Sequence, residues 1–311
     1  MNLISLLRYM LTLIFLGTSS AVPTKDRNLP GIFVRYKEDR MLFDCGEGTQ
    51  RQLMAKKLKF VKISKIFITH WHADHFAGLM GLIQTMELEG RRDPLYIYGP
   101  IHTKKFVERF INVGYFARRF EVFVKEMKND DSVEFGEYTI SAFEVKHRIP
   151  ALGFVFKENA RVNIDLKKLG KYSIKQGPLV GKLKKYGFVE KNGKAIKLED
   201  VSKITKGRKL VYTGDTRYFK ALEKYAKDAD VFVCDCTFDN EYAKKAHIYG
   251  HCCAGKAAEI AKEANVGKLY LTHISRRYQE KGTSPNILQE QARQIFKKSY
   301  LAKDLLEVDI K

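Results

Sequence analysis

The sequence predicts an α/β protein in which two mixed β-sheets pack together and helices cover the outside. Strand-like and helical runs alternate along the 311 residues, the order that this architecture requires. Candidate metal ligands follow several strand-like runs directly, and these runs lie in both halves of the chain. No Pro- or Ser-rich linker separates the halves, so we expect one domain over residues 1–311.

The expected elements are defined by their hydrophobic periodicity and by the turn residues that bound them. Strands are expected at residues 11–16, 31–36, 40–43, 64–69, 95–98, 120–124, 138–146, 210–213, 231–234 and 268–272. Helices are expected at residues 76–87, 101–113, 218–227, 254–264 and 286–296.

The most informative motif is the run H-W-H-A-D-H at residues 70–75, directly after the strand expected at 64–69. His70 and His72 are two residues apart, so in an extended chain they point to the same side and can bind one metal. Asp74 and His75 follow as the chain turns and can face a second metal. Imidazole and carboxylate ligands are typical of zinc sites, whereas a structural scaffold has no need of such a cluster.

Further candidate ligands stand at the ends of three later strand-like runs, namely His147, Asp215 and His273. Ligands at the carboxyl ends of strands collect at one edge of a sheet, where open α/β folds place their sites. Five of the eight histidines belong to this combined set. Any one of them alone would be an ordinary histidine, but together they predict a metal centre.

The charge distribution predicts a polyanionic partner. The chain carries 56 Lys+Arg against 36 Asp+Glu, a net charge of +20, which is typical of nucleic-acid-binding proteins. Residues 161–194 hold ten basic and two acidic residues, whereas an even spread of the charge would give them only about +2. This glycine-containing stretch is expected to be an inserted basic arm. The competing interpretation is a solvated lysine-rich loop of a heat-adapted protein.

Four stretches together resemble one family within the metallo-β-lactamase superfamily, the tRNase Z family of tRNA 3′-processing endonucleases. They are residues 15–28 with P-x-K-x-R-N, residues 42–52, the glycine-proline stretch at 177–184, and T-H-I-S-R-R-Y at 272–278. The H-x-H-x-D-H motif alone would indicate only the superfamily. The resemblance implies a four-layer αβ/βα sandwich with two packed mixed sheets and an inserted basic arm.

The resemblance also implies two Zn²⁺ ions per chain. It assigns His70, His72 and His147 to one zinc. It assigns Asp74, His75 and His273 to the other, with Asp215 between the two.

Catalytic roles follow from the same resemblance. Asp74 would orient the attacking water or accept its proton, and His251, oriented by Asp235, would protonate the leaving group. Two departures from the family bear on this. Ala73 stands where the family has glycine, and Cys234-Asp235-Cys236-Thr237 stands where it has H-E-A-T. The shorter Asp235 leaves its pairing with His251 open, and a structural role for His251 is the alternative.

The predicted activity is removal of the 3′ trailer from precursor tRNA by a homodimer. The residues expected to contact RNA are charged, or belong to the arm's glycine-proline motif: Gly177, Pro178, Lys182, Lys184, Lys185, Lys25 and Arg27. Lys25 and Arg27 could instead brace the site, and Asp44 is expected to be buried and to brace the metal loops. The alternatives are another superfamily hydrolase (a phosphodiesterase, arylsulfatase or lactonase) and a non-catalytic RNA-binding relative.

The expected location is the cytoplasm, without membrane attachment. The five cysteines are an odd number and indicate a reducing compartment. The apolar run at residues 11–16 is expected to be the first strand of the sheet. Met10 is then a plausible start and residues 1–9 an extension, and a signal peptide is the competing interpretation.

Overall fold

The computed structural model describes residues 11–115, 119–191, 193–279 and 283–311. The chain divides into two compact units: a main unit, Met1–Phe156 with Arg208–Lys311, and an inserted unit, Lys157–Gly207. Each unit has its own core. The expected extension at residues 1–9 and the expected start at Met10 lie outside the described residues.

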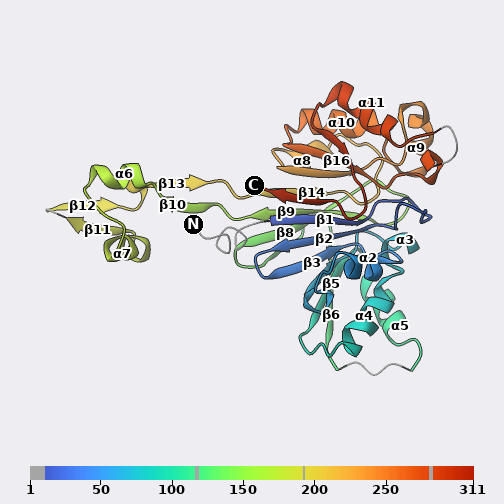
Figure 1. Ribbon diagram of the computed structural model, residues 1–311, viewed down its shortest axis with the longest axis horizontal. Helices are drawn as coiled ribbons and strands as arrows, with labels where there is room; N and C mark the ends of the chain where they lie inside the picture. The colour runs from blue at the N-terminus through green and yellow to red at the C-terminus, as the bar shows by residue number, and fades with distance from the viewer. Residues whose placement is uncertain (1–10, 116–118, 192, 280–282) are drawn as a thin grey trace. The chain divides into compact units, whose positions relative to one another are not determined.

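The first sheet of the main unit has the strand order β18-β1-β2-β3-β4-β5-β6 (Figure 1). Its strands are β18 (Glu307–Ile310), β1 (Leu11–Gly17), β2 (Gly31–Tyr36), β3 (Asp39–Phe43), β4 (Lys65–Phe67), β5 (Leu95–Gly99) and β6 (Val122–Glu126). The pairs from β18 to β3 are antiparallel and those from β3 to β6 are parallel. The sheet is therefore mixed, as expected.

The second sheet has the order β17-β16-β15-β14-β9-β8-β7. Its strands are β17 (Ser299–Leu301), β16 (Lys268–Thr272), β15 (Val231–Asp235), β14 (Lys209–Tyr212), β9 (Leu152–Glu158), β8 (Tyr138–Glu144) and β7 (Ser132–Glu134). Strands β14 to β17 are parallel, and β7 and β8 are antiparallel. The parallel strands end at the same edge, so the residues that follow them can meet there.

Helices cover the outer face of each sheet (Figure 1). Those of the first half are α2 (Thr49–Ala55), α3 (Ala73–Phe76), α4 (Leu79–Leu88) and α5 (Thr103–Ile111), with the 3₁₀ turn η1 (Phe60–Lys62). Those of the second half are α8 (Leu222–Ala226), α9 (Ala243–Tyr249), α10 (Ala254–Glu263) and α11 (Asn286–Ile295), with η3 (Asn240–Tyr242) and η4 (Arg276–Gln279). The two sheets and their two helical layers form the expected four-layer sandwich.

The packing of β1 explains why this strand is almost entirely apolar, with Thr12 as its one polar residue. Leu11, Leu13 and Phe15 belong to the cluster between the two sheets. Ile14 and Leu16 face the opposite way, into the cluster beneath the first helical layer. A strand that is buried on both faces reads as a continuous hydrophobic run, so this run at residues 11–16 is the expected first strand.

Helix α4 begins later than expected, at Leu79 instead of residue 76. The preceding turn, α3, ends at Phe76, and Gly78 separates the two helices. A Cβ at Gly78 would come within 2.1 Å of the carbonyl oxygen of Gly46. This close backbone approach fixes the metal-loop helix α3 against the loop that follows β3.

The inserted unit consists of β10 (Arg161–Ile164), α6 (Leu166–Lys171), α7 (Pro178–Tyr186), β11 (Phe188–Lys191), β12 (Lys194–Lys197), η2 (Glu199–Val201) and β13 (Ser202–Thr205). Strand β10 pairs with β13, and β11 with β12. The unit has a small core that includes Leu169, Leu183 and Val201. The basic arm expected at residues 161–194 lies inside this longer structured segment.

Among the described residues, no helix has both the length and the apolar character that crossing a membrane requires.

Candidate metal centre and active site

The seven predicted metal ligands lie in the main unit, and most of them follow the carboxyl end of a strand. His70 and His72 come after β4, and Asp74 and His75 lie in α3. His147 comes after β8, Asp215 after β14 and His273 after β16. The structure thus brings together residues that are up to about 200 positions apart, as the strand-then-ligand pattern predicts.

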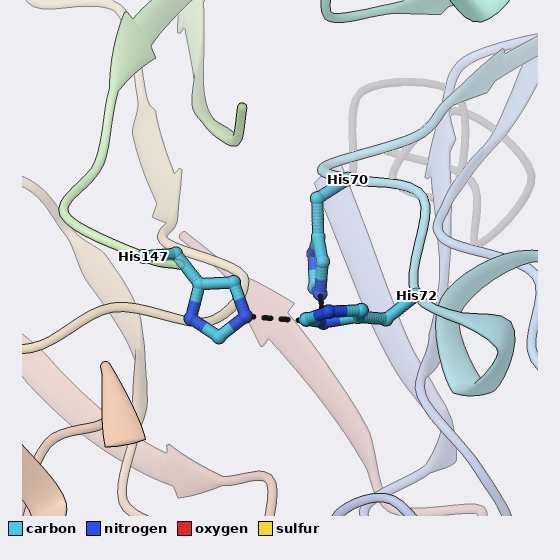
Figure 2. Close-up of side chains that lie close together, drawn as sticks. All are labelled: His70, His72 and His147. Atoms are coloured by element: carbon cyan, nitrogen blue, oxygen red, sulfur yellow. Dashed lines mark hydrogen bonds between the residues drawn. The ribbon is translucent and has the colours of Figure 1, made fainter. Parts of the chain in front are cut away.

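His70, His72 and His147 form the first group (Figure 2). The Nδ1 atom of His72 lies 3.1 Å from Nε2 of His70 and 3.1 Å from Nε2 of His147. Burial is the main cause that lowers the pKa of all three imidazoles, most strongly at His70, and neighbouring imidazoles add to it, among them His251 beside His147. The three side chains are therefore neutral, which is the form that binds a metal.

Asp74, His75, Asp215 and His273 form the second group. Nε2 of His273 lies 3.4 Å from Oδ2 of Asp74 and 3.2 Å from Oδ2 of Asp215. Nε2 of His75 lies 3.2 Å from Oδ1 of Asp215. Asp215 also reaches the first group, because its Oδ2 is 3.7 Å from Nε2 of His70.

Two buried polar atoms of the second group test whether its residues fit a metal ion. Within the described part of the chain, Nε2 of His75 and Oδ1 of Asp215 have no hydrogen-bond partner. Buried polar atoms without a partner are costly, and they are rare in folded proteins. Both atoms face the second group, where a cation would satisfy them together.

The electrostatics of the second group also favour a cation. Burial opposes a charge on Asp215, but His273 and His75 outweigh it and hold the pKa of this carboxyl well below its usual range. Burial likewise opposes a charge on His75. The carboxylates of Asp215, Asp44 and Asp74 outweigh it and hold the pKa of this imidazole well above its usual value. A metal ion would replace the proton that these carboxylates attract to His75.

The donor set fits zinc. Zinc binds imidazole nitrogen at about 2.0–2.1 Å, which places the ligands of a tetrahedral site about 3.3 Å apart. The 3.1 Å nitrogen separations of the first group are close to this value. Both groups combine imidazole with nearby carboxylate, the donor types of hydrolytic zinc sites.

Asp44 is fully buried, as expected, and it orients two of the predicted metal ligands, His75 and His70. Its Oδ2 accepts hydrogen bonds from His75 Nδ1 at 2.8 Å and from the Tyr212 hydroxyl at 2.8 Å. The Thr69 hydroxyl, 3.0 Å from both carboxylate oxygens, also lies 3.0 Å from Nδ1 of His70. Asp44 thus fixes His75 directly and His70 through Thr69, which leaves Nε2 of each imidazole for the metal.

Asp235 orients two other histidines of the site, His251 and His273. It is fully buried at the end of β15, and its Oδ2 lies 2.8 Å from Nδ1 of His251. Its Oδ1 accepts a hydrogen bond from the Thr237 hydroxyl at 2.8 Å, and this hydroxyl lies 2.9 Å from Nδ1 of His273. The shorter aspartate therefore reaches His251, and it also supports a metal ligand through Thr237.

The charge of Asp235 determines the protonation of His251. Burial opposes the imidazolium, but the negative charge and hydrogen bond of Asp235 raise the pKa of His251 to about 9. Oδ2 of Asp215 lies 3.8 Å from Nδ1 of His251. A protonated imidazole beside the metal ligands can donate a proton to a leaving group.

The substitution of alanine for the family's glycine at position 73 is accommodated without strain. Ala73 is the first residue of α3 and does not occur among the residues with positive φ. A side chain therefore fits at this position, as the sequence interpretation required. Asp74, the next residue, accepts a hydrogen bond at 3.0 Å from the backbone N–H of Ala21.

The surroundings of Arg27 distinguish between its two predicted roles, RNA contact and bracing of the site. Its side chain is buried, and its Nη1 donates to the Thr18 hydroxyl at 2.6 Å and to the Ala302 carbonyl at 2.7 Å. Burial also lowers the pKa of this guanidinium, and nearby Asp304 opposes that shift. This burial argues against RNA contact and favours the bracing role, whereas Lys25 on the same loop is exposed.

The other predicted RNA-binding residues lie in the inserted unit. Gly177 precedes α7, Pro178 is its first residue, and Lys182, Lys184 and Lys185 follow along the helix. All five are exposed, and their contact with RNA stays a prediction.

Several residues at the site escaped the sequence interpretation. Thr69 and Thr237 carry the hydroxyl links to Asp44 and Asp235, and the Gly250 carbonyl accepts a hydrogen bond at 2.9 Å from Nδ1 of His147. Thr69 stands directly before His70, so its position offered a signal. Thr237 meets His273 across 36 residues, and only the fold shows that contact.

Two family models match the chain. The one described as Anti-Pycsar protein Apyc1 matches residues 11–173. The one described as Beta-lactamase superfamily domain matches residues 201–274.

Sequence relatives and solved structures extend over nearly the whole chain. The Ribonuclease Z of Methanosarcina acetivorans is 42% identical over 303 residues, which cover 97% of this chain and 98% of that protein. The Ribonuclease Z of Thermococcus onnurineus is 45% identical over 271 residues, 86% of each protein. The crystal structure of human tRNase Z, short form, is similar with a TM-score of 0.71 at 28% identity, and the match covers 96% of this chain and 99% of that one.

The four-layer fold and the histidine–aspartate site define a metallo-β-lactamase-superfamily enzyme. Within this superfamily, the two Ribonuclease Z relatives match this chain at 42% and 45% identity over 97% and 86% of its length. The chain belongs to the ribonuclease Z family of endoribonucleases.

Proposed function

We propose that this protein is a zinc-dependent endoribonuclease that removes the 3′ trailer from precursor tRNA. The main observation is that the predicted ligands and the His251–Asp235 pair lie together, next to strand ends of both sheets. They do so in a chain that is 42% identical to a Ribonuclease Z over 97% of its length. No predicted ligand is displaced from the site, which argues against a non-catalytic relative.

Two zinc ions per chain are part of this proposal. His70, His72 and His147 would hold one, Asp74, His75 and His273 would hold the other, and Asp215 would be shared. When bound, the ions supply Lewis acidity, which activates water and offsets the charge that builds on the phosphodiester. The orphaned atoms of His75 and Asp215 support the proposal.

Asp74, His251 and Asp235 each have a separate role in the proposed reaction. Water adds to phosphorus as the bond from phosphorus to the ribose 3′-oxygen breaks, and Asp74 orients that water or accepts its proton. His251 donates a proton to the departing 3′-oxygen, and Asp235 holds His251 in position. The phosphate stays on the trailer, so the products are a tRNA 3′-hydroxyl and a trailer 5′-phosphate.

The inserted unit would bind the tRNA through its exposed basic residues. Lys182, Lys184 and Lys185 lie on α7, and two aromatic side chains near them, Tyr186 and Phe188, are 60% and 57% exposed. Cations and exposed rings suit a phosphate backbone and unstacked bases. We also propose a cytoplasmic homodimer, in which the arm of one subunit serves the active site of the other.

The test uses zinc-loaded full-length protein and a 5′-labelled precursor tRNA with a 3′ trailer. We expect one cut where the tRNA joins the trailer, which leaves a 3′-hydroxyl on the tRNA and a 5′-phosphate on the trailer. Asp215→Ala is the inactive control. If the protein hydrolyses bis(p-nitrophenyl) phosphate but leaves the precursor intact, the enzyme is instead a small-molecule phosphodiesterase of the same superfamily.

A further inference from the structure

A second pocket adjoins the metal centre on the side of His251. The pocket at the metal centre has a volume of about 350 Å³, and the second, which we call the basic pocket, has about 590 Å³. His251 and Tyr249 line both. The basic pocket lies within the size range of ligand sites, and it shares lining residues with the pocket at the metal centre.

The basic pocket is strongly cationic. Lys245, Arg276 and Arg277 line it together with His251, and none of the described residues that line it is acidic. Within the described part of the chain, none of these three cations forms an ion pair with a carboxylate. Unpaired cations that converge on a pocket create a site for an anion, and phosphate is the anion that an RNA substrate supplies.

The cations alternate with aromatic rings in a fixed series. The guanidinium carbon of Arg277 lies 4.9 Å from the ring centre of Phe238 and 4.3 Å from that of Tyr242. Nζ of Lys245 lies 6.0 Å from the ring centre of Tyr242 and 5.8 Å from that of Tyr249. These cation–π contacts hold the charges in place without neutralising them.

Tyr249 ends this series beside the metal centre. Its side chain is 45% exposed, whereas Phe238 at the other end is only 6% exposed. An exposed ring next to unpaired cations is the arrangement that binds single-stranded nucleotides, because a base stacks on the ring while the cations contact phosphate.

A larger neighbouring cavity, of about 880 Å³, does not share this chemistry. Tyr242, Lys245 and Arg277 also border it, but three carboxylates do so too, those of Asp239, Glu241 and Glu290. These carboxylates would repel phosphate. The anion site is therefore confined to the side of Lys245 and Arg277 that faces Tyr249 and His251.

We propose that the basic pocket binds the nucleotide on the 5′ side of the cut, with its base on Tyr249 and its phosphate at Lys245 and Arg276. The assignment to the 5′ side of the cut depends on the role of His251, and it therefore rests on the proposed function. His251 lines both pockets, and in the proposed reaction it lies beside the departing 3′-oxygen, which belongs to the last nucleotide retained in the tRNA. The pocket beyond His251 therefore receives this nucleotide and not the first nucleotide of the trailer.

The experiment compares three precursor tRNAs under single-turnover conditions: an intact one, one without the base of the last retained nucleotide, and one without the base of the first trailer nucleotide. For the wild-type enzyme, loss of the retained base should slow cleavage on the order of 5- to 150-fold, the range of one stacked base. Loss of the trailer base should have little effect.

Substitution of Tyr249 should abolish this discrimination. Tyr249→Ala should cleave the intact precursor as slowly as the wild-type enzyme cleaves the one that lacks the retained base, and should no longer distinguish the two. Tyr249→Phe should behave as wild type because it keeps the ring. Tyr96→Ala removes another partly exposed tyrosine, 38% exposed on β5, and should leave the discrimination unchanged.

The proposed phosphate contact is tested by comparing two neighbouring lysines of α9, Lys245 and Lys244. Lys245→Ala should raise KM for the precursor and reduce the dependence of binding on salt by about one unit of slope. The exposed neighbour Lys244 does not line the basic pocket, so Lys244→Ala should have neither effect.

Three outcomes would overturn the inference in different ways. If Tyr249→Ala discriminates as wild type does, or Lys245→Ala behaves like Lys244→Ala, the basic pocket does not hold the nucleotide. If Tyr249→Ala abolishes only the effect of removing the trailer base, the pocket binds the first nucleotide of the trailer. If the wild-type enzyme cleaves no precursor but hydrolyses bis(p-nitrophenyl) phosphate, the proposed function itself fails.

Discussion

Oδ2 of Asp235 lies 2.8 Å from Nδ1 of His251, and the opposite oxygen of the same carboxylate accepts a hydrogen bond from Thr237. Thr237 in turn contacts Nδ1 of His273 at 2.9 Å. One buried carboxylate therefore orients both the proposed proton donor and a proposed metal ligand. This link explains how the chain can carry aspartate where the resemblance led us to expect glutamate.

His251→Ala should retain two zinc ions and bind precursor tRNA almost normally, yet cleave it about a hundredfold or more slowly, because a general acid contributes about that much. Hydrolysis of bis(p-nitrophenyl) phosphate should change much less, since p-nitrophenolate leaves without a proton. Single-turnover rates, metal analysis and a binding assay measure these effects. Loss of zinc, or equal slowing on both substrates, would make His251 a structural residue.

The cleavage rate should fall as the pH rises through the pKa of His251, which Asp235 raises to about 9 against the effect of burial. A proton donor acts in its protonated form, so its contribution is present below this pKa and is lost above it. Asp235→Asn removes the charge that raises the pKa and should move this decline to lower pH. The measurement is kcat between pH 6 and 10, and an unchanged profile would contradict the pairing.

Asp215→Ala should abolish cleavage and remove most of the bound metal, because Asp215 contacts ligands of both groups. Wild-type protein should bind about two zinc ions per chain and lose activity when a chelator is added. Elemental analysis of dialysed protein tests both statements. Lys25→Ala, an exposed change on another loop, is the control that should keep its metal. Normal cleavage by Asp215→Ala would refute the metal assignment.

Replacing Lys182, Lys184 and Lys185 together by alanine should weaken precursor binding and reduce its salt dependence by two to three units of slope, about 0.7–0.9 for each lost phosphate contact. Hydrolysis of a small phosphodiester should be unaffected. The matched control replaces the exposed lysines Lys227, Lys262 and Lys268, which lie near the amino ends of β15 and β16, at the edge opposite the metal site. If both triple variants weaken binding equally, the effect is one of total charge.

Arg27→Ala should lower the free energy of unfolding by about 1.5–3 kcal/mol or more, the size of a hydrogen bond to a charged group. The variant loses the bonds to Thr18 and Ala302 and leaves their oxygens buried. Urea denaturation of zinc-loaded protein measures this, and Lys25→Ala should change stability by less than about 0.5 kcal/mol. Unaltered stability with impaired RNA binding would restore the predicted RNA contact.

The sequence by itself predicted the layered fold and the candidate metal ligands. Both depend on local patterns, because a strand's period sets its buried faces and a ligand directly after a strand must emerge at the sheet edge. The strands at 31–36 and 268–272 have the expected bounds, and the seven predicted ligands lie close together, next to strand ends of both sheets.

Only the tertiary structure decided which polar groups meet around these ligands. Arg27 is buried because the chain brings Ala302 to it across 275 residues, and nothing near Arg27 in sequence signals that contact. Thr237 meets His273 in the same way, and the series from Phe238 to Tyr249 acquires Arg277 only when η4 packs beside it. Such contacts depend on how distant segments pack together, whereas periodicity describes only neighbours along the chain.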